Sequence, residues 1–276
     1  RDKNLLLIPM QEKTLAFRNS LINYRRSGEG PELLLCFHGY GENARAFDFL
    51  AKYIGNQYTV YAIELPFHGH TQWKEGLLFT GTDLLEILDL LLSKEPSFTL
   101  MGFSLGGRVA LSLYQLVPDR VNKMVLLAPD GLKVNGWYWL ATQTRLGNRF
   151  FSFTMRHPGW FLWILHGMKK LRMINTSIYK FVDYYIGSQQ MRDDLYTRWT
   201  TFRRLKPDLK KIRRQIGEHQ TIVRLVYGLH DRIIRSSTGE KFRKGIASNC
   251  SLEIIASGHQ VLHEKHASDI VRELTR

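Results

Sequence analysis

The feature that most constrains this chain is the pattern G-F-S-L-G at residues 102–106. An apolar run, 98–101, precedes it, and a segment whose apolar residues have helical spacing, 106–117, follows it. A serine with glycines two residues before and two residues after it, at such a junction, occupies a tight turn with strained backbone angles. The glycines allow the strand and the helix to approach closely there. Its hydroxyl projects above the sheet at a helix N-terminus, whose dipole favours developing negative charge. The pattern therefore predicts Ser104 as a nucleophile.

Short apolar runs that are typical of buried strands alternate with helical patterns along much of the chain. Strands are expected at 33–37, 59–65, 98–102, 124–128, 221–227 and 251–255. Helices are expected at 44–54, 84–92, 106–117, 239–246 and 266–274. This alternation is typical of β-α-β units, in which parallel strands are covered by helices. The sequence therefore predicts an α/β fold with a mostly parallel central sheet flanked by helices.

The positive charge of the chain is concentrated in one segment. From Gly131 to Arg214, 17 lysines and arginines stand against 4 aspartates and glutamates, which accounts for +13 of the net charge of +14. The same segment holds five of the six tryptophans, and its apolar residues follow helical spacing. We therefore predict that residues 1–130 and 215–276 build one core, and that 131–214 form a helical, basic, aromatic-rich insert.

Other motifs accompany the serine turn. They are H-G-Y-G at 38–41, L-P-F-H-G-H-T at 65–71, Y-G-L-H-D at 227–231 and S-G-H at 257–259. With these motifs in this order, the chain resembles the α/β-hydrolase superfamily, and within it the esterase-like and lipase-like serine hydrolases. The resemblance implies the α/β-hydrolase fold, with residues 131–214 as an inserted helical cap. The chain departs from the family pattern at Phe67, where glycine is common, and at Glu64, where many relatives carry aspartate.

The resemblance also implies which residues complete a catalytic triad with Ser104. His259 lies in the loop where the family places its general base, and His263 is its main rival. Asp231 follows a predicted strand at the family's usual position for the carboxylate that orients the base. Asp130 follows an earlier predicted strand and remains an alternative, because some relatives draw their acid from that strand.

The family resemblance further implies an oxyanion hole, in which two backbone N–H groups stabilise the negative charge that develops on the substrate. One donor is expected from Leu105, the residue after the nucleophile, and the other from Tyr40 in the loop 38–41. The candidate substrate-binding residues are the aromatic side chains Phe103, Trp137, Trp160 and Trp163. Aromatic residues at helical spacing also occur as ordinary core, and that interpretation stays open for each of them.

We therefore expect a serine hydrolase that cleaves a carboxylic ester through an acyl-enzyme on Ser104. The basic, aromatic insert favours a small-molecule ester that is lipid-derived or anionic. The same triad can serve C–C bond hydrolysis, thioester cleavage or acyl transfer, and these alternatives stay open. A non-catalytic protein that binds membrane or nucleic acid is less favoured, because the triad motifs are intact.

Neither a metal nor a cofactor is expected, because the chain has no H-E-x-x-H or C-x-x-C pattern and no G-x-G-x-x-G after a strand. Nucleic acid is not an expected partner, because the insert carries no recognised motif for binding it. The first residues lack the apolar core of a secretory signal, and no apolar stretch is long enough to span a membrane. We expect a cytoplasmic protein whose basic insert makes peripheral contact with anionic membranes.

Overall fold

In the computed structural model, the described residues are 9–92, 97–133, 136–171, 173–174 and 176–276. The chain divides into two compact units. The larger unit comprises Arg1–Glu75, Thr80–Lys133 and Leu205–Arg276, and the smaller unit comprises Gly76–Phe79 and Val134–Arg204.

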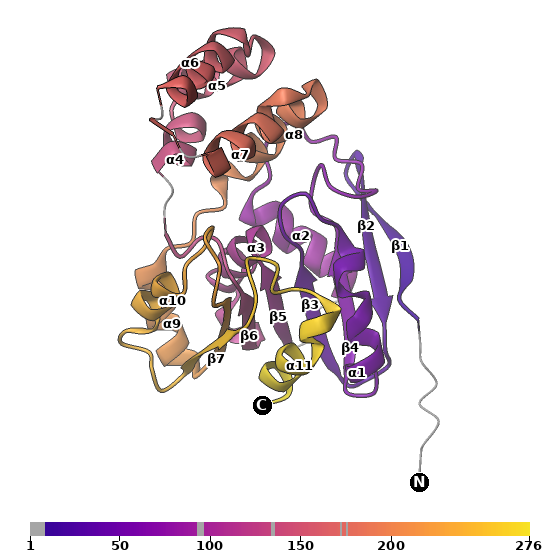
Figure 1. Cartoon of the computed structure of the whole chain (residues 1–276). Coiled ribbons are helices and arrows are strands. Elements are labelled where there is room, and N and C mark those ends of the chain that lie inside the picture. The colour runs from indigo at the N-terminus through magenta and orange to yellow at the C-terminus, as the bar shows by residue number, and fades with distance from the viewer. Residues whose placement is uncertain (1–8, 93–96, 134–135, 172, 175) are drawn as a thin grey trace. The chain divides into compact units, whose positions relative to one another are not determined.

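Among the described residues, the larger unit contains one eight-stranded sheet (Figure 1). Its strands are β1 (Gln11–Phe17), β2 (Ser20–Ser27), β3 (Glu32–Phe37), β4 (Tyr58–Ile63), β5 (Phe98–Phe103), β6 (Val121–Leu127), β7 (Ile222–Gly228) and β8 (Cys250–Ile255). Their spatial order is β1-β2-β4-β3-β5-β6-β7-β8. β2 is antiparallel to both of its neighbours, and the other adjacent pairs are parallel. The predicted α/β fold with a mostly parallel sheet is confirmed.

Helices cover both faces of this sheet. They are η1 (Ala44–Leu50), α1 (Ala51–Ile54), α2 (Gly81–Leu92), α3 (Leu105–Tyr114), η2 (Pro118–Arg120), α9 (Leu209–His219), α10 (Ser236–Arg243), η4 (Glu264–His266) and α11 (Ala267–Thr275). α1 and α11 lie on one face, and α2 and α3 lie on the other (Figure 1). This covering explains why β5, in the middle of the sheet, is buried along its whole length and is apolar apart from Thr99.

The β1–β2 hairpin is absent from the sequence prediction. β1 is exposed or half-buried at every position before Phe17, so it lacks the apolar run that marks the inner strands. Its two-residue connection begins at Arg18, which has a φ of 51°. Such left-handed backbone is typical of the tight turns that join two antiparallel strands.

The smaller unit is helical. It contains α4 (Gly136–Gln143), α5 (Arg145–Arg156), α6 (Gly159–Lys170), α7 (Thr176–Gly187), α8 (Gln189–Thr201) and η3 (Phe202–Arg204). Arg192 of α8 holds several of these helices together, because its buried guanidinium donates to the carbonyl oxygens of Met155, at 2.8 Å, and Ile186, at 2.7 Å. No helix in the described part of the chain is long and apolar enough to cross a membrane.

The bounds of the smaller unit differ from the predicted insert, 131–214, at both ends. Residues after Arg204 belong to the larger unit, because Leu205, Ile212 and Ile216 are buried in it. The segment Gly76–Phe79 belongs to the smaller unit although it lies far away in sequence. Its Phe79 N–H donates to the carbonyl of Thr201 at 2.9 Å, and the ring of Phe79 packs against Phe202.

Candidate active site

Ser104 lies at the turn between β5 and α3. Its backbone has a φ of 49° and a ψ of −114°. This positive φ is strained, and residues other than glycine rarely adopt it. The turn is held from both sides, since the N–H of Ser104 donates to Leu127 at 3.0 Å and its carbonyl accepts from Gly107 at 2.9 Å. The hydroxyl therefore sits at the N-terminus of α3, as the G-F-S-L-G pattern predicts.

Close packing of backbone around this turn requires glycine. A Cβ atom at Gly106 would lie 1.9 Å from the carbonyl oxygen of Phe37, at the end of β3. A Cβ atom at Gly102 would lie 2.4 Å from the carbonyl oxygen of Gly106. Neither contact is possible without moving backbone, so the two glycines fix how tightly the strand and the helix approach.

We expect Gly106→Ala to lower the free energy of unfolding by about 3 kcal/mol, because backbone must shift to accept the new methyl group. The matched control is Gly217→Ala at an exposed position of helix α9, where an added Cβ meets no atom within 4 Å. That change should raise stability by about 0.5–1 kcal/mol, because alanine favours the helix. Urea unfolding of both variants measures the difference, and equal stabilities would contradict the steric argument.

Two neighbouring loops bring a carboxylate and an imidazole to the serine. Asp231 follows β7 and His259 follows β8, and the loops bond to each other where the N–H of His230 donates to the carbonyl of Ser257 at 2.9 Å. A Cβ atom at Gly228 would lie 1.9 Å from the carbonyl oxygen of Gly258. The close approach of these two loops fixes the separation of the two side chains.

The three side chains form one hydrogen-bonded chain. His259 Nε2 lies 3.1 Å from the hydroxyl oxygen of Ser104, and His259 Nδ1 lies 2.8 Å from Asp231 Oδ2. The other carboxylate oxygen of Asp231 accepts the backbone N–H groups of Ile233, at 2.7 Å, and Ile234, at 2.9 Å. The buried carboxylate of Asp231 accepts a hydrogen bond from His259 Nδ1 and so favours the tautomer that carries its proton on Nδ1. Nε2 is then free to accept the proton of the serine hydroxyl.

The side chains of the two rival candidates have other partners, although the backbone N–H of Asp130 donates to the carbonyl of Ser104 at 2.9 Å. Asp130 forms an ion pair with Arg108, and its second oxygen accepts the N–H of Gly131 at 2.7 Å. His263 is exposed and accepts the N–H of Lys265 at 3.1 Å, which caps η4. The geometry therefore brings together Ser104, His259 and Asp231.

The sequence matches the family model described as alpha/beta hydrolase fold over residues 32–266, which is most of the chain. The chain belongs to the α/β-hydrolase family. It is 30% identical over 128 residues to a pimeloyl-[acyl-carrier protein] methyl ester esterase of Aeromonas salmonicida, a match covering 46% of this chain and 49% of that protein. Similar esterases of Vibrio campbellii and Photobacterium profundum are matched over only 40% and 39% of their lengths.

Longer matches agree with this family membership. The uncharacterized hydrolase YugF of Bacillus subtilis is 22% identical over 263 residues, which cover 88% of this chain and 91% of that protein. Among solved structures, a thermophilic esterase from Thermogutta terrifontis aligns with a TM-score of 0.67 and 16% identity, over 96% of this chain and 98% of that one. This structural likeness shows the shared α/β-hydrolase fold.

The two oxyanion-hole candidates of this α/β-hydrolase stay predictions. Leu105 is the first residue of α3, and the first N–H groups of a helix have no carbonyl one turn earlier to bond. Tyr40 follows β3 in a loop that reaches the serine turn, since a Cβ atom at Gly39 would lie 2.8 Å from the ring of Phe103. His38 anchors that loop, because its Nε2 accepts the N–H of Leu65 at 3.1 Å.

The candidate substrate-binding residues have different surroundings. Phe103 is buried, and its ring centre lies 5.4 Å from that of His259, so it supports the imidazole from beside it. The tryptophans Trp137, Trp160 and Trp163 belong to the smaller unit of the α/β-hydrolase and are exposed there. Their part in substrate binding stays a prediction. In the described residues, no group of three or more His, Cys, Asp or Glu could hold a metal ion.

Glu42, which none of the sequence motifs indicated, links two loops of the site. Its carboxylate accepts the N–H of Gly39 at 3.2 Å and the side-chain amide of Gln260 at 2.7 Å. Gln260 directly follows His259, so Glu42 ties the loop after β3 to the loop that carries the imidazole. Burial raises the pKa of Glu42 above the usual range of a carboxyl group. An acidic residue just after the H-G-Y-G motif was the only signal in the sequence.

We expect Glu42→Gln to lower kcat/KM for an ester by about tenfold at neutral pH, because hydrogen bonds to a charged group become neutral ones. The loss should shrink as pH falls, since the native Glu42 then takes up a proton and loses its charge as well. Its raised pKa places the onset of this convergence above that of an ordinary carboxyl group. A pH profile of both proteins measures it, and a constant ratio of rates would contradict this positioning role.

Proposed function

We propose that this α/β-hydrolase cleaves carboxylic esters through an acyl-enzyme on Ser104. The observation that carries the proposal is the hydrogen-bonded chain from the serine hydroxyl through His259 to the carboxylate of Asp231. A serine hydroxyl becomes a strong nucleophile when an adjacent base takes its proton, and an oriented imidazole can later return that proton to the leaving group.

The reaction would run in two halves. Ser104 attacks the ester carbonyl while His259 accepts its proton, and Asp231 stabilises the imidazolium that forms. The N–H groups of Leu105 and Tyr40 would stabilise the oxyanion before the alcohol leaves with the proton from His259. Water, activated by the same imidazole, then releases the acid and restores the serine.

The substrate we propose is a small ester with a lipid-derived or anionic acyl group. The relative from Aeromonas salmonicida carries the name of a methyl ester esterase, which supports an ester as the substrate class. The positive charge and the exposed tryptophans of the smaller unit support an acyl group that is anionic or apolar. Thioester cleavage, C–C bond hydrolysis and acyl transfer use the same three groups and define the competing reactions. Cytoplasmic localisation stays a prediction.

A fluorophosphonate probe tests this proposal directly. We expect one adduct, mapped by mass spectrometry to Ser104, and turnover of p-nitrophenyl esters with an optimum in acyl chain length. A matched alkyl thioester series and an added alcohol acceptor separate ester hydrolysis from thioester cleavage and acyl transfer. Folded protein that forms no adduct would contradict the proposal and favour a non-catalytic role.

A further inference from the structure

The smaller unit contains a long stretch without any acidic residue. No aspartate or glutamate occurs between Asp130 and Asp183, whereas lysine and arginine recur throughout this stretch. Cations in this stretch therefore have few local partners, and their field adds up instead of cancelling. α5 and α6 lie entirely within it.

The exposed side of α5 carries two adjacent rows of side chains. One row is basic and consists of Arg145, Arg149 and Arg156, which are four and seven residues apart and so share one helical face. The neighbouring row is apolar and consists of Leu146, Phe150 and Phe153, whose residues are 81%, 56% and 52% exposed. Among the described residues, none of these three arginines forms an ion pair. α5 thus leaves both charge and apolar area uncovered.

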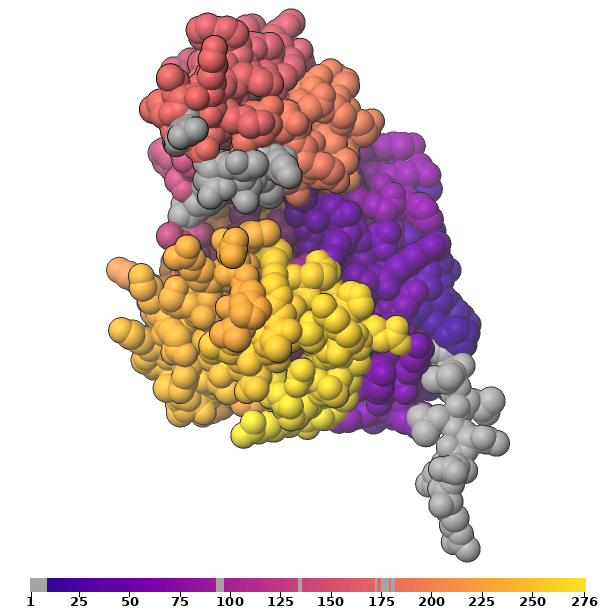
Figure 2. Space-filling model, viewed as in Figure 1, coloured from indigo at the N-terminus to yellow at the C-terminus, as the bar shows by residue number. Residues whose placement is uncertain are grey.

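α6 continues the same surface. The ring of its Trp160 packs 5.3 Å from that of Phe150, which joins the two helices into one apolar region. Trp163 of α6 is 79% exposed, and Lys169 and Lys170 end the helix. We call these exposed residues of α5 and α6 the α5–α6 surface. Both helices form part of the outer surface of the smaller unit in the view of Figure 2.

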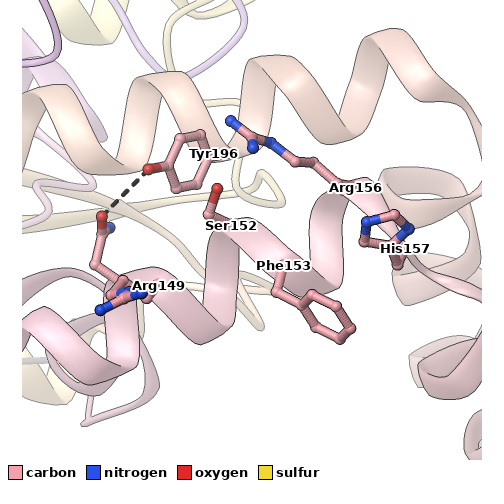
Figure 3. A pocket seen from close by; sticks show the side chains of 7 residues that line it. Arg149, Ser152, Phe153, Arg156, His157 and Tyr196 are labelled. Carbon is pink, nitrogen blue, oxygen red and sulfur yellow. Dashed lines mark hydrogen bonds between the residues drawn. The ribbon is translucent and has the colours of Figure 1, made fainter.

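A cavity of about 310 Å³ adjoins the basic row, between α5 and α8. Its lining residues are Asn148, Arg149, Ser152, Phe153, Arg156, His157 and Tyr196. In Figure 3 the guanidinium of Arg156 is turned toward Ser152 and Tyr196, and Tyr196 donates to Asn148 at 3.2 Å. The lining residues carry two guanidinium groups and two hydroxyls, those of Ser152 and Tyr196, but no carboxylate. This donor set suits the oxygen atoms of a phosphate group.

We propose that the α5–α6 surface binds a bilayer containing anionic phospholipid, with a lipid phosphate in the cavity that Arg149 and Arg156 line. Tryptophan, phenylalanine and leucine enter the boundary between headgroups and acyl chains, while lysine and arginine meet the negative headgroups. The pairing of an arginine row with an exposed apolar row favours lipid over an acidic protein or nucleic acid, because phosphate alone would leave the apolar row in water. The binding goes beyond the proposed ester hydrolysis and does not require it.

The test is cosedimentation of the full chain with vesicles, in the Ser104→Ala background so that hydrolysis does not alter the lipid. One set of vesicles is phosphatidylcholine alone, and the other contains about 30% phosphatidylserine, which carries the negative charge. We expect binding to the anionic vesicles only, and we expect it to weaken as salt rises. Equal binding to both vesicles, or binding to neither, overturns the proposal.

Substitutions test whether the α5–α6 surface is the part of the protein that binds the vesicles. Arg149→Gln with Arg156→Gln should weaken binding by about 25-fold, at about fivefold for each cation. The control pair, Lys210→Gln with Lys211→Gln, makes the same charge change on exposed residues of α9 in the larger unit and should change binding less than twofold. Trp163→Ser should weaken binding by about tenfold even at high salt, because it removes apolar contact.

Three results would overturn the assignment. The control pair could weaken binding as much as the arginine pair, which would show that only net charge matters. Trp163→Ser could leave binding unchanged, which would remove the apolar contact with lipid. Soluble poly-glutamate or glycerol phosphate could bind as tightly as the vesicles, which would identify an acidic protein or a free phosphate ester as the ligand. Circular dichroism and thermal unfolding of each variant confirm that its fold is intact.

Discussion

Ser104→Ala is expected to lower kcat for ester hydrolysis by about 10⁶-fold, because the hydroxyl that would form the proposed acyl-enzyme is lost. Little activity should survive from the imidazole alone, since His259 would have no group to activate. The fold should persist, because the side chain of Ser104 does not cap α3. Hydrolysis of a p-nitrophenyl ester under single-turnover and steady-state conditions measures the loss.

Ser237→Ala is the matched control for this change. Ser237 is an exposed serine of α10 in the larger unit, and its replacement should leave both rate and probe labelling unchanged. If Ser104→Ala kept substantial turnover, or if the fluorophosphonate adduct moved to another serine, Ser104 could not be the nucleophile.

Asp231→Asn is expected to lower kcat by about 10⁴-fold with little change in KM. The amide can donate to His259 Nδ1, which favours the tautomer whose Nε2 already carries a proton and cannot accept one from Ser104. The buried side chain of Asp231 bonds two backbone N–H groups through its other oxygen, and asparagine keeps that oxygen. Ground-state binding should therefore survive while proton transfer fails.

Asp130→Asn tests which of the two candidate carboxylates, Asp231 or Asp130, orients the general base. Asp130 binds Arg108 and the N–H of Gly131, so its replacement should reduce kcat by less than about tenfold. Steady-state kinetics of both variants decide between them. A larger loss for Asp130→Asn than for Asp231→Asn would reverse the assignment of the acid.

Much of the core was predictable because its strands are buried on both faces. The apolar stretches 33–37 of β3 and 124–127 of β6 reflect this burial, and the turn at Ser104 is marked by glycines that close packing requires. β1 was not predictable in the same way, since most of its positions face water. The residues 44–54, predicted as one helix, form the 3₁₀ helix η1 followed by the α-helix α1. The sequence could not separate them, because in so short a segment the spacing of apolar residues does not distinguish the two kinds of helix.

The site was predictable in its motifs and less so in its supporting contacts. The positions of Asp231 and His259 follow from the ends of β7 and β8, where parallel strands of an α/β sheet deliver their loops to one edge. Glu42 acts through Gly39 and Gln260, which are far apart in sequence, so no local pattern connects them. The bounds of the smaller unit likewise depend on long-range contacts such as that of Phe79 with Thr201.

The order of the units along the chain determines when the residues of the candidate site become available during synthesis. Ser104 precedes the segment Val134–Arg204, whereas Asp231 and His259 follow it. A growing chain therefore contains Ser104 before it contains His259, the base we propose for it. We expect the hydroxyl to stay unactivated until β7 has paired with β6 and β8 has paired with β7. Under the proposed mechanism, reaction of Ser104 with a fluorophosphonate would thus report that the last strands have formed, and a chain halted earlier would leave Ser104 unreactive.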